Sequence, residues 1–186
     1  MLVLSLAAGL AVRSAVEQVL RAATSTKSAQ LPLLDLRWPN DLLLNGKKIA
    51  GILIELTAEA TRVHYAVLGL GINVNQSAFP AALQSSATSL RLETGRVFSR
   101  VDLTAALLKS IDREYQNLTR SESGARESVL RRFTQHSSYV KGRRVHVNEN
   151  GDFEGITAGL DTHGFLQVKT PDGTRSVLSG GVRALD

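Results

Sequence analysis

Two polar segments of this chain bring together residue types that bind and activate anionic ligands. The first runs Arg37-Trp38-Pro39-Asn40-Asp41 and continues, after Asn45-Gly46, as the apolar run from Lys47 to Glu55. It holds a carboxylate, carboxamides and a pair of lysines, and a lysine held by a carboxylate provides a fixed positive charge for carboxylate or phosphate oxygens. The second segment is Gly69-Leu70-Gly71-Ile72-Asn73-Val74-Asn75, whose glycines allow a ligand to approach the backbone.

The dipeptide Asn45-Gly46 predicts how the first segment folds. Asn-Gly between two apolar runs is the strongest short-range signal for a β-hairpin with a two-residue loop. Such a loop pairs residue 44 with 47, 43 with 48, 42 with 49 and 41 with 50. Since side chains alternate between the two faces of a strand, Asp41 and Lys48 are expected on the same face, as diagonal neighbours within roughly 8 Å. Lys47 is expected to point the other way, into solvent.

The residues expected opposite Asp41 are small. In this register Ala50 lies opposite Asp41 with a short side chain, and Gly51 follows with none. We therefore expect open space for a ligand beside the Asp41–Lys48 pair.

Each of these residues also has a structural interpretation. An Asp41–Lys48 pair can be an ordinary surface salt bridge, which contributes about 0 to 1 kcal/mol. Asn40 can cap the turn that follows the proline, and Asn73 can be a turn former, because asparagine bonds readily to nearby backbone. Trp38 is more often a core residue than a stacking platform. The glycines around Leu70 do not form the longer dinucleotide-binding fingerprint.

Apolar periodicity predicts the elements that must position these residues. Residues 1–22 and Ser99 to Leu118 have helical spacing, and a further helix is expected from Ser121 to His136. Strands are expected at 33–37, 42–44, from Lys47 onward and at 63–70, the last of them breaking at Gly69 and Gly71. After Tyr139, short alternating runs at 144–147, 153–160, 165–170 and 175–178 are typical of a small β barrel. We therefore expect two domains, residues 1–139 and 140–186.

Composition limits the class of protein further. With 186 residues, 43% hydrophobic and 21% charged, the chain has a globular composition and room for a medium domain plus a small one. It has no cysteine, which excludes disulfides and thiolate zinc sites, and its four histidines are dispersed, so no metal site is expected. A cytoplasmic protein is the expectation. The alternative, that the apolar start is a signal peptide, lacks support from basic residues ahead of it.

The charge is asymmetric along the chain. The net charge is +5, and the excess lies late, in a basic cluster of six residues: Arg126, Arg131, Arg132, Lys141, Arg143 and Arg144. Such a cluster attracts phosphate, nucleic acid or an acidic protein, or it is simply the solvated face of a helix.

The two polar segments resemble the catalytic domain of biotin protein ligases. The matching order is Arg-Trp-Pro-Asn-Asp, then Asn-Gly, then Lys-Lys-Ile-Ala-Gly-Ile-Leu-Ile-Glu-Leu, then Leu-Gly-Leu-Gly-Ile-Asn-Val-Asn. The run from Gly155 to Asp161 and the pair Gly180-Gly181 look like the carboxy-terminal SH3-like domain of that family. The resemblance implies an α+β fold, in which a mixed β-sheet packed with helices, similar to class II synthetases, precedes a small SH3-like β barrel.

The resemblance also implies an activity. Such enzymes condense biotin with ATP to biotinyl-5'-AMP, with Mg²⁺ at the phosphates, and pass the biotinyl group to a lysine of a carboxylase carrier domain. Carried over by position, Lys48 would contact the biotin carboxylate and the α-phosphate, and Asp41 would orient Lys48; these two are the expected catalytic residues. Asn40 and Asn73 would contact the nucleotide. Gly51 and Ile52 would form one wall of the biotin site.

Further expectations follow from what this chain shares with the family and what it lacks. Residues 54–57 would lie near a sheet edge used for a homodimer. The Gly- and Arg-rich loop that closes over the adenylate does not occur here, so the activity of a chain of this length is in doubt. The DNA-binding domain of the bifunctional members is missing too, so neither DNA nor a membrane is an expected partner. Two alternatives remain open: a ligase that acts on lipoate, and a non-catalytic binding module that uses the basic helix and the barrel.

Overall fold

The computed structural model describes residues 2–24, 31–59, 62–120, 124–149 and 151–185. The helices are α1 (Leu2–Ala23), α2 (Leu90–Thr94), α3 (Arg100–Arg120) and α4 (Ala125–Gln135), with a short 3-10 helix, η1, at Ala81–Leu83. The first group of strands is β1 (Leu34–Arg37), β2 (Asp41–Leu44), β3 (Lys47–Glu59) and β4 (Arg62–Ile72). The second group is β5 (Lys141–Asn148), β6 (Phe153–Leu160), β7 (Leu166–Thr170), β8 (Gly173–Val177) and β9 (Gly181–Ala184).

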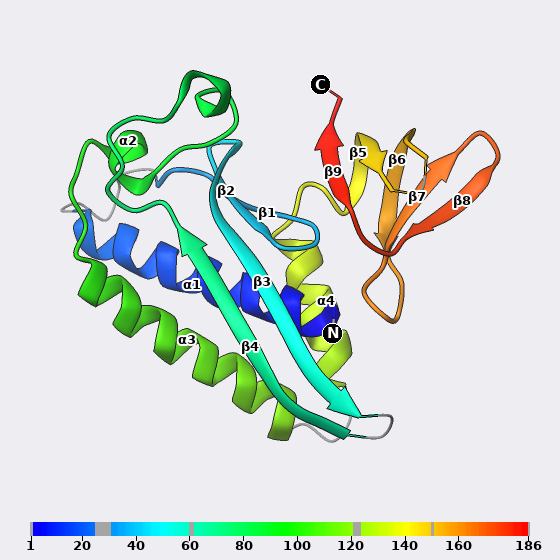
Figure 1. Cartoon of the computed structure of the whole chain (residues 1–186), viewed down its shortest axis with the longest axis horizontal. Coiled ribbons are helices and arrows are strands. Elements are labelled where there is room, and N and C mark those ends of the chain that lie inside the picture. The colour runs from blue at the N-terminus through cyan, green and yellow to red at the C-terminus, as the bar shows by residue number, and fades with distance from the viewer. Residues whose placement is uncertain (1, 25–30, 60–61, 121–123, 150, 186) are drawn as a thin grey trace.

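These strands form two separate sheets, and the α+β class is confirmed. The first sheet has the order β1-β2-β3-β4 and packs with α1, α3 and α4, whereas the second has the order β8-β7-β6-β5-β9 and lies to one side (Figure 1). We expected mixed pairing in the first sheet, but every named strand pair in it is antiparallel. The one parallel pairing among the described residues is an isolated bridge between Lys48 and Ala87.

Helix α1 is the centre of the core. Its side chains at Leu6, Leu10, Val12, Val16 and Leu20 are buried, in agreement with the helical spacing of the sequence. A methyl group added at Gly9 would touch Leu36 of β1 and Phe133 of α4, so α1 is packed between the sheet and α4. By length and apolar composition alone, α1 is the single helix among the described residues that qualifies as a candidate membrane span.

The β2–β3 hairpin forms around Asn45-Gly46, but its register differs from the prediction. Asn45 and Gly46 have positive φ of 50° and 82°, as a two-residue hairpin loop requires. Pairing starts as expected and then shifts between Leu42 and Leu43, so that Asp41 pairs with Gly51 and not with Ala50. The extra residue is Ile49, which is fully buried next to the buried Ala50. A β-bulge allows two successive residues to enter the core.

Strand β4 continues where we expected it to break. It runs to Ile72 and pairs Gly69 with Leu53 and Gly71 with Gly51, so the two glycines lie inside the ladder and not in a turn. Neither glycine has a positive φ. The polar turn therefore begins later, at Asn73.

The carboxy-terminal region is a five-stranded antiparallel sheet. Its strands β5 to β8 agree with the expected alternating runs, while β9 was not predicted. Buried Val145, Val147, Val168 and Val177 line its inner side. Strand β9 pairs with β5 and forms one edge of the sheet, so the end of the chain lies beside the first strand of this sheet.

Replacing Gly155 by alanine is expected to destabilise this sheet by about 1 to 3 kcal/mol, because overpacking forces the backbone to shift. A Cβ at this position would lie 2.6 Å from Cγ1 of Val168 and even closer to the carbonyl oxygen of Lys169. Urea unfolding of the variant measures the loss. Gly181→Ala is the matched control, since its Cβ would meet nothing within 4 Å. Equal midpoints for the two variants would contradict the packing.

Candidate active site

Asp41, Lys48 and Arg37 form a compact ionic cluster at the start of the hairpin. Lys48 Nζ lies 2.5 Å from Asp41 Oδ1, and Arg37 Nη2 lies 2.6 Å from Asp41 Oδ2. The Asp41 side chain is only 12% exposed, whereas that of Lys48 is 43% exposed. The predicted meeting of Asp41 with Lys48 is confirmed despite the shifted register. The half-buried pair presents its ammonium group to solvent and holds its carboxylate inside.

Gly51 makes room for the lysine side chain. A Cβ built on Gly51 would lie 3.2 Å from both Cε and Nζ of Lys48 and 3.7 Å from Asp41 Oδ1. Because Gly51 is the ladder partner of Asp41, only a residue without a side chain leaves the Lys48 ammonium in its present place. The shifted register thus places the glycine, and not the alanine, beside the pair.

A loop after β4 fixes the backbone of Lys48 from the other side. The Lys48 amide donates to Ser86 O at 2.8 Å, and the Thr88 amide donates to Lys48 O at 3.0 Å. The Asn73 amide donates to Ile49 O at 2.7 Å, so Asn73 is held next to the same strand. Within the described part of the chain, no hydrogen bond of the Asn73 side chain is found. Its carboxamide is therefore available to a ligand.

These residues line one cavity of about 960 Å³. Lys48, Gly51 and Asn73 line it together with Arg37, as do Tyr139 from the connection into the second sheet and Arg183 from β9. The structure thus brings together three of the residues that the sequence singled out. The cationic side chains on the wall suit an anionic ligand.

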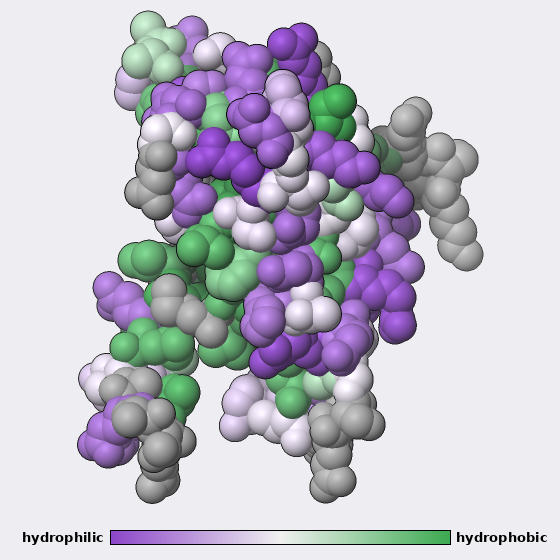
Figure 2. Space-filling model, turned by 90° about the vertical axis from the view of Figure 1, so that its right-hand side faces the viewer, coloured by the Kyte–Doolittle hydropathy of each residue, from purple (hydrophilic) through white to green (hydrophobic). Residues whose placement is uncertain are grey.

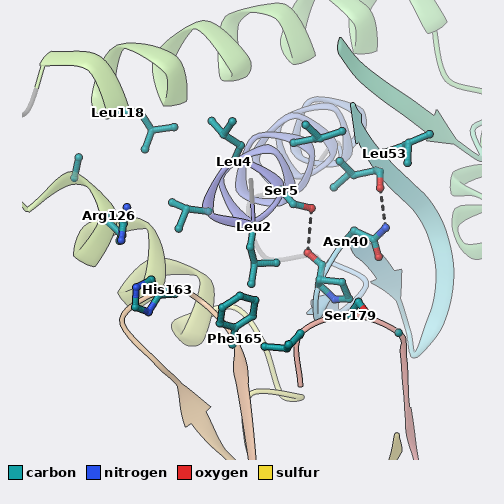
Figure 3. A pocket seen from close by; sticks show the side chains of 17 residues that line it. Leu2, Leu4, Ser5, Asn40, Leu53, Leu118, Arg126, His163, Phe165 and Ser179 are labelled. Carbon is teal, nitrogen blue, oxygen red and sulfur yellow. Dashed lines mark hydrogen bonds between the residues drawn. The ribbon is translucent and has the colours of Figure 1, made fainter. Parts of the chain in front are cut away.

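Asn40 and Ile52 lie on a different cavity. A second hollow, of about 750 Å³, lies between the amino-terminal end of α1, β3, α4 and two turns of the carboxy-terminal sheet, and both residues line it. Figure 3 shows Asn40 Nδ2 donating to the carbonyl oxygen of Ile52, at 2.8 Å, so its amide ties the turn to β3. Ile52 is 3% exposed and belongs to the core. Asn40 thus bonds to backbone, as the structural interpretation expects, but to the carbonyl of Ile52 on β3 and not within its own turn.

The second cavity is mainly apolar. Leu2, Leu4, Leu53 and Phe165 surround it, with Arg126 and His163 at its side (Figure 3). On the face of the molecule drawn in Figure 2, hydrophobic surface gathers at the lower left, while the upper half is mostly hydrophilic. Arg126 is the one Lys or Arg side chain among the residues that line it, whereas Arg37, Lys48 and Arg183 all line the other cavity.

Trp38 is a buried residue that links the site to the second sheet. It is 1% exposed, and its Nε1 donates to Gly164 O at 3.0 Å in the turn between β6 and β7. Asp35 of β1 holds the connection that leads from α4 into the second sheet, since Oδ1 accepts from the amide of Ser138 at 2.8 Å and Oδ2 from its hydroxyl at 2.5 Å. The core interpretation of Trp38 is confirmed.

Trp38→Phe is expected to lower the free energy of unfolding by about 1 to 3 kcal/mol, because it leaves the Gly164 carbonyl without its donor. Thermal and urea unfolding measure the loss. The variant keeps an aromatic ring, but phenylalanine is smaller than the fully buried tryptophan, so part of the loss comes from the cavity that it leaves. An unfolding midpoint equal to that of the unsubstituted chain would show that Gly164 finds water or another donor.

Two of the six members of the basic cluster are paired with carboxylates within the chain, and a third stacks on an aromatic ring. Arg132 makes a bidentate pair with Glu114, at 2.6 and 2.8 Å, and Arg144 approaches Glu154 at 3.2 Å. Arg143 stacks over the Tyr139 ring at 5.5 Å. The cluster is therefore not a continuous free positive stripe.

No role was predicted for three residues that line the larger cavity, the one beside Lys48: Arg37, Tyr139 and Arg183. Arg37 was visible in the motif, and its spacing of four from Asp41 across a turn is a signal for a pair. Arg183 and Tyr139 carried no such signal, because only the fold brings them near Lys48. Among the described residues no group of three or more His, Asp or Glu side chains could hold a metal ion.

Comparison with known proteins assigns the class. Residues 2–73 match the biotin/lipoate A/B protein ligase family, and residues 141–182 match the biotin protein ligase C terminal domain. The first match covers the helix and the first sheet, and the second covers the carboxy-terminal sheet.

Individual relatives agree with this class. The chain is 34% identical over 157 residues to the bifunctional ligase/repressor BirA of Bacillus spizizenii, covering 80% of this chain and 45% of that protein. It is 31% identical over 182 residues to the biotin–[acetyl-CoA-carboxylase] ligase of Mycobacterium tuberculosis, covering 96% of this chain and 61% of that one. The chain thus spans about half of the length of these relatives.

Solved structures show the same fold. The apo biotin protein ligase from Aquifex aeolicus superposes with a TM-score of 0.82 at 27% identity, covering 99% of this chain and 76% of that one. The same enzyme in complex with biotin and ATP gives 0.79, at 27% identity, with 99% and 72% covered. The chain belongs to the biotin protein ligase family.

Proposed function

We propose that this chain is a biotin–[acetyl-CoA-carboxylase] ligase, which makes biotinyl-5'-AMP from biotin and ATP and transfers biotin to a lysine of a carboxylase carrier domain. The observation that carries the proposal is Lys48 on the wall of the larger cavity, beside Gly51 and Asn73, with its ammonium group paired to the mostly buried Asp41 behind it. The match of both family domains supports it.

In the first step, a carboxylate oxygen of biotin attacks the α-phosphorus of ATP, and the bond to pyrophosphate breaks. Two anions must meet for this attack, and the transition state spreads further charge over the phosphoryl oxygens. The Lys48 ammonium, held by Asp41 at 2.5 Å, would be a preorganised cation at the place where the two anions meet. Because the site sets its position before the ligands arrive, little reorganisation is needed during the reaction.

In the second step, the carrier lysine attacks the carbonyl carbon of the mixed anhydride, an amide forms and AMP leaves. Asn73 would contact the nucleotide, since its side-chain carboxamide has no hydrogen bond to the described residues and it lines the cavity. Mg²⁺ would arrive on the ATP phosphates, because a magnesium ion commonly binds through substrate oxygens. This agrees with the finding that no group of three or more His, Asp or Glu side chains among the described residues could hold a metal ion.

Biotin is favoured over lipoate by the carboxy-terminal sheet. The match over residues 2–73 is to a family that includes both kinds of ligase, so it does not separate them. The match over residues 141–182 is to a domain of biotin protein ligases. The non-catalytic alternative is weakened by the internal pairing of Arg132 and Arg144.

Incubation of the purified chain with biotin, Mg²⁺ and α-³²P-labelled ATP tests the proposal. Thin-layer chromatography is expected to show labelled biotinyl-5'-AMP, and adding a biotin carrier domain is expected to release labelled AMP. Lipoate in place of biotin is the matched control and is expected to give little product. No adenylate at saturating ligand, with a chain that is folded by circular dichroism, would refute the activity of this chain.

The oligomeric state is a separate proposal. The edge of β3 near Ile54 to Thr57 would carry a homodimer, and light scattering of the chain with and without ligand measures it. A mass of one chain under every condition would refute the dimer and leave the ligase proposal standing.

A further inference from the structure

Arg37 is the third member of the ionic cluster, and it contacts the same carboxylate that holds Lys48. It is the ladder partner of Asp41 on the neighbouring strand, so the Trp38-Pro39-Asn40 turn brings the two side chains together. Its Nη2 and Nε lie 2.6 and 3.2 Å from the same carboxylate oxygen, Asp41 Oδ2. Oδ1 is thereby left to Lys48.

The cluster has one carboxylate between two cations. An isolated Asp41–Lys48 pair would be neutral overall and would attract a further anion weakly. With Arg37 added, the formal charge of the cluster is +1. Both Arg37 and Lys48 line the larger cavity, so the excess charge lies on its wall. Asp41 is nearly buried, and buried charges are screened less than exposed ones.

We propose that Arg37 is a positioning residue for the adenylation step: it holds Asp41 so that Oδ1 faces Lys48, and it leaves the cluster with a net positive charge for the reacting anions. The inference rests on the proposed function for its chemistry. Its structural content, a cation that acts on an anion through Asp41 and Lys48, is tested without any turnover.

The geometry favours arginine for this task. The guanidinium group is planar, carries several N–H donors and keeps its charge under all ordinary conditions. It can therefore donate to one carboxylate through more than one N–H. Here both of its contacts fall on one oxygen, which fixes the rotation of the carboxylate. A neutral side chain at position 37 would leave the carboxylate free to turn and would leave Lys48 fully compensated.

The test is a double-mutant cycle with inorganic pyrophosphate as the probe, measured by isothermal titration calorimetry. Arg37→Gln is expected to weaken pyrophosphate binding about tenfold, and Lys48→Ala more than that. In the Lys48→Ala background, Arg37→Gln still removes a charge from the wall but can no longer act on Lys48, so it is expected to cost clearly less, about threefold. Arg113→Gln, which removes an exposed charge from α3, is the control and is expected to change binding less than twofold.

Equal tenfold losses in both backgrounds would overturn the inference, because Arg37 would then act independently of Lys48. No effect of Arg37→Gln on the unsubstituted chain would overturn it as well, and so would failure of the unsubstituted chain to bind pyrophosphate. Arg37→Lys keeps the charge and is expected to restore affinity to within about threefold. Affinity as weak as that of Arg37→Gln, in a variant that unfolds like the unsubstituted chain, would also count against the inference.

The same variants separate this inference from the proposed function. In labelled-ATP assays, Arg37→Gln is expected to lower kcat for adenylate formation about tenfold with a smaller change in KM for biotin, because positioning acts mainly in the transition state. Pyrophosphate binding that follows the cycle, without any adenylate from the unsubstituted chain, would refute the ligase proposal and leave only the coupling of Arg37 to Lys48 through Asp41 standing. Adenylate formation that Arg37→Gln leaves unchanged would refute the positioning role but not the ligase.

Discussion

Lys48→Ala is expected to slow biotinyl-adenylate formation by about 10²- to 10³-fold, the usual loss when one preorganised charge-stabilising donor is removed. The reason is local, since Nζ of Lys48 lies 2.5 Å from Asp41 and faces the larger cavity. Single-turnover assays with labelled ATP measure the rate, and the affinity for biotinyl-5'-AMP is expected to fall in parallel. The fold is expected to survive, because the Lys48 side chain is 43% exposed.

Lys47→Ala is the matched control. The prediction that Lys47 extends freely into solvent was incomplete, because its Nζ donates to Gln84 O at 3.1 Å, in an exposed hydrogen bond. Loss of such a bond is expected to change the rate less than about threefold. Equal losses for the two lysine variants would contradict the assignment of Lys48.

Gly51→Ala is expected to slow adenylate formation about 10-fold to 100-fold while changing stability little. The new methyl group would lie 3.2 Å from Cε and Nζ of Lys48, and the far end of a lysine can move aside at small cost. The ammonium would then have to shift by a few tenths of an ångström beside Asp41, and a misplacement of about 1 Å at a reacting centre costs up to about 10²-fold. Rate assays and thermal unfolding of the same preparation give the two readouts.

Gly69→Ala separates a steric effect on Lys48 from a general effect of adding a methyl group to the β3–β4 ribbon. Its Cβ would make ordinary contacts with Leu53, at 3.6 and 3.7 Å, and would not touch the lysine. The unfolding midpoints of the two glycine variants are expected to be similar. A Gly51→Ala chain with the full adenylation rate would show that the lysine is not held where the structure places it.

The sequence was sufficient to predict the Asp41–Lys48 contact but not the pairing that produces it. Asn45-Gly46 determines the loop, and alternation then places both side chains on one face. The run Leu42-Leu43-Leu44 is buried throughout, so it has no alternation that could define a register. Ile49 and Ala50 are buried one after the other, and a β-bulge makes this possible. The position of such a bulge cannot be predicted without the core against which the strand packs.

Long-range proximity was beyond the reach of local patterns. Asn40 and Lys48 are neighbours in the motif, yet they line different cavities, because Asn40 turns towards Ile52. Arg183 and Tyr139 reach the larger cavity only through the packing of the carboxy-terminal sheet. Similarly, Gly69 and Gly71 suggested a turn, although pairing with β3 keeps them inside a strand.

The resemblance to biotin protein ligases supplied the family and the α+β class, which the comparisons confirm. The helices α1 and α3 followed directly from apolar periodicity. Strand β9, with four residues, was missed. The roles of the site residues stay predictions that the variants above test.

A crystal structure of the chain with a non-hydrolysable analogue of biotinyl-5'-AMP tests the central claim most directly. We expect the phosphoryl-equivalent oxygens within hydrogen-bonding distance of Lys48 Nζ, in the cavity that Gly51 and Asn73 line. An analogue seated instead in the apolar hollow beside Asn40 and Phe165, with Lys48 making no contact to it, would contradict the account.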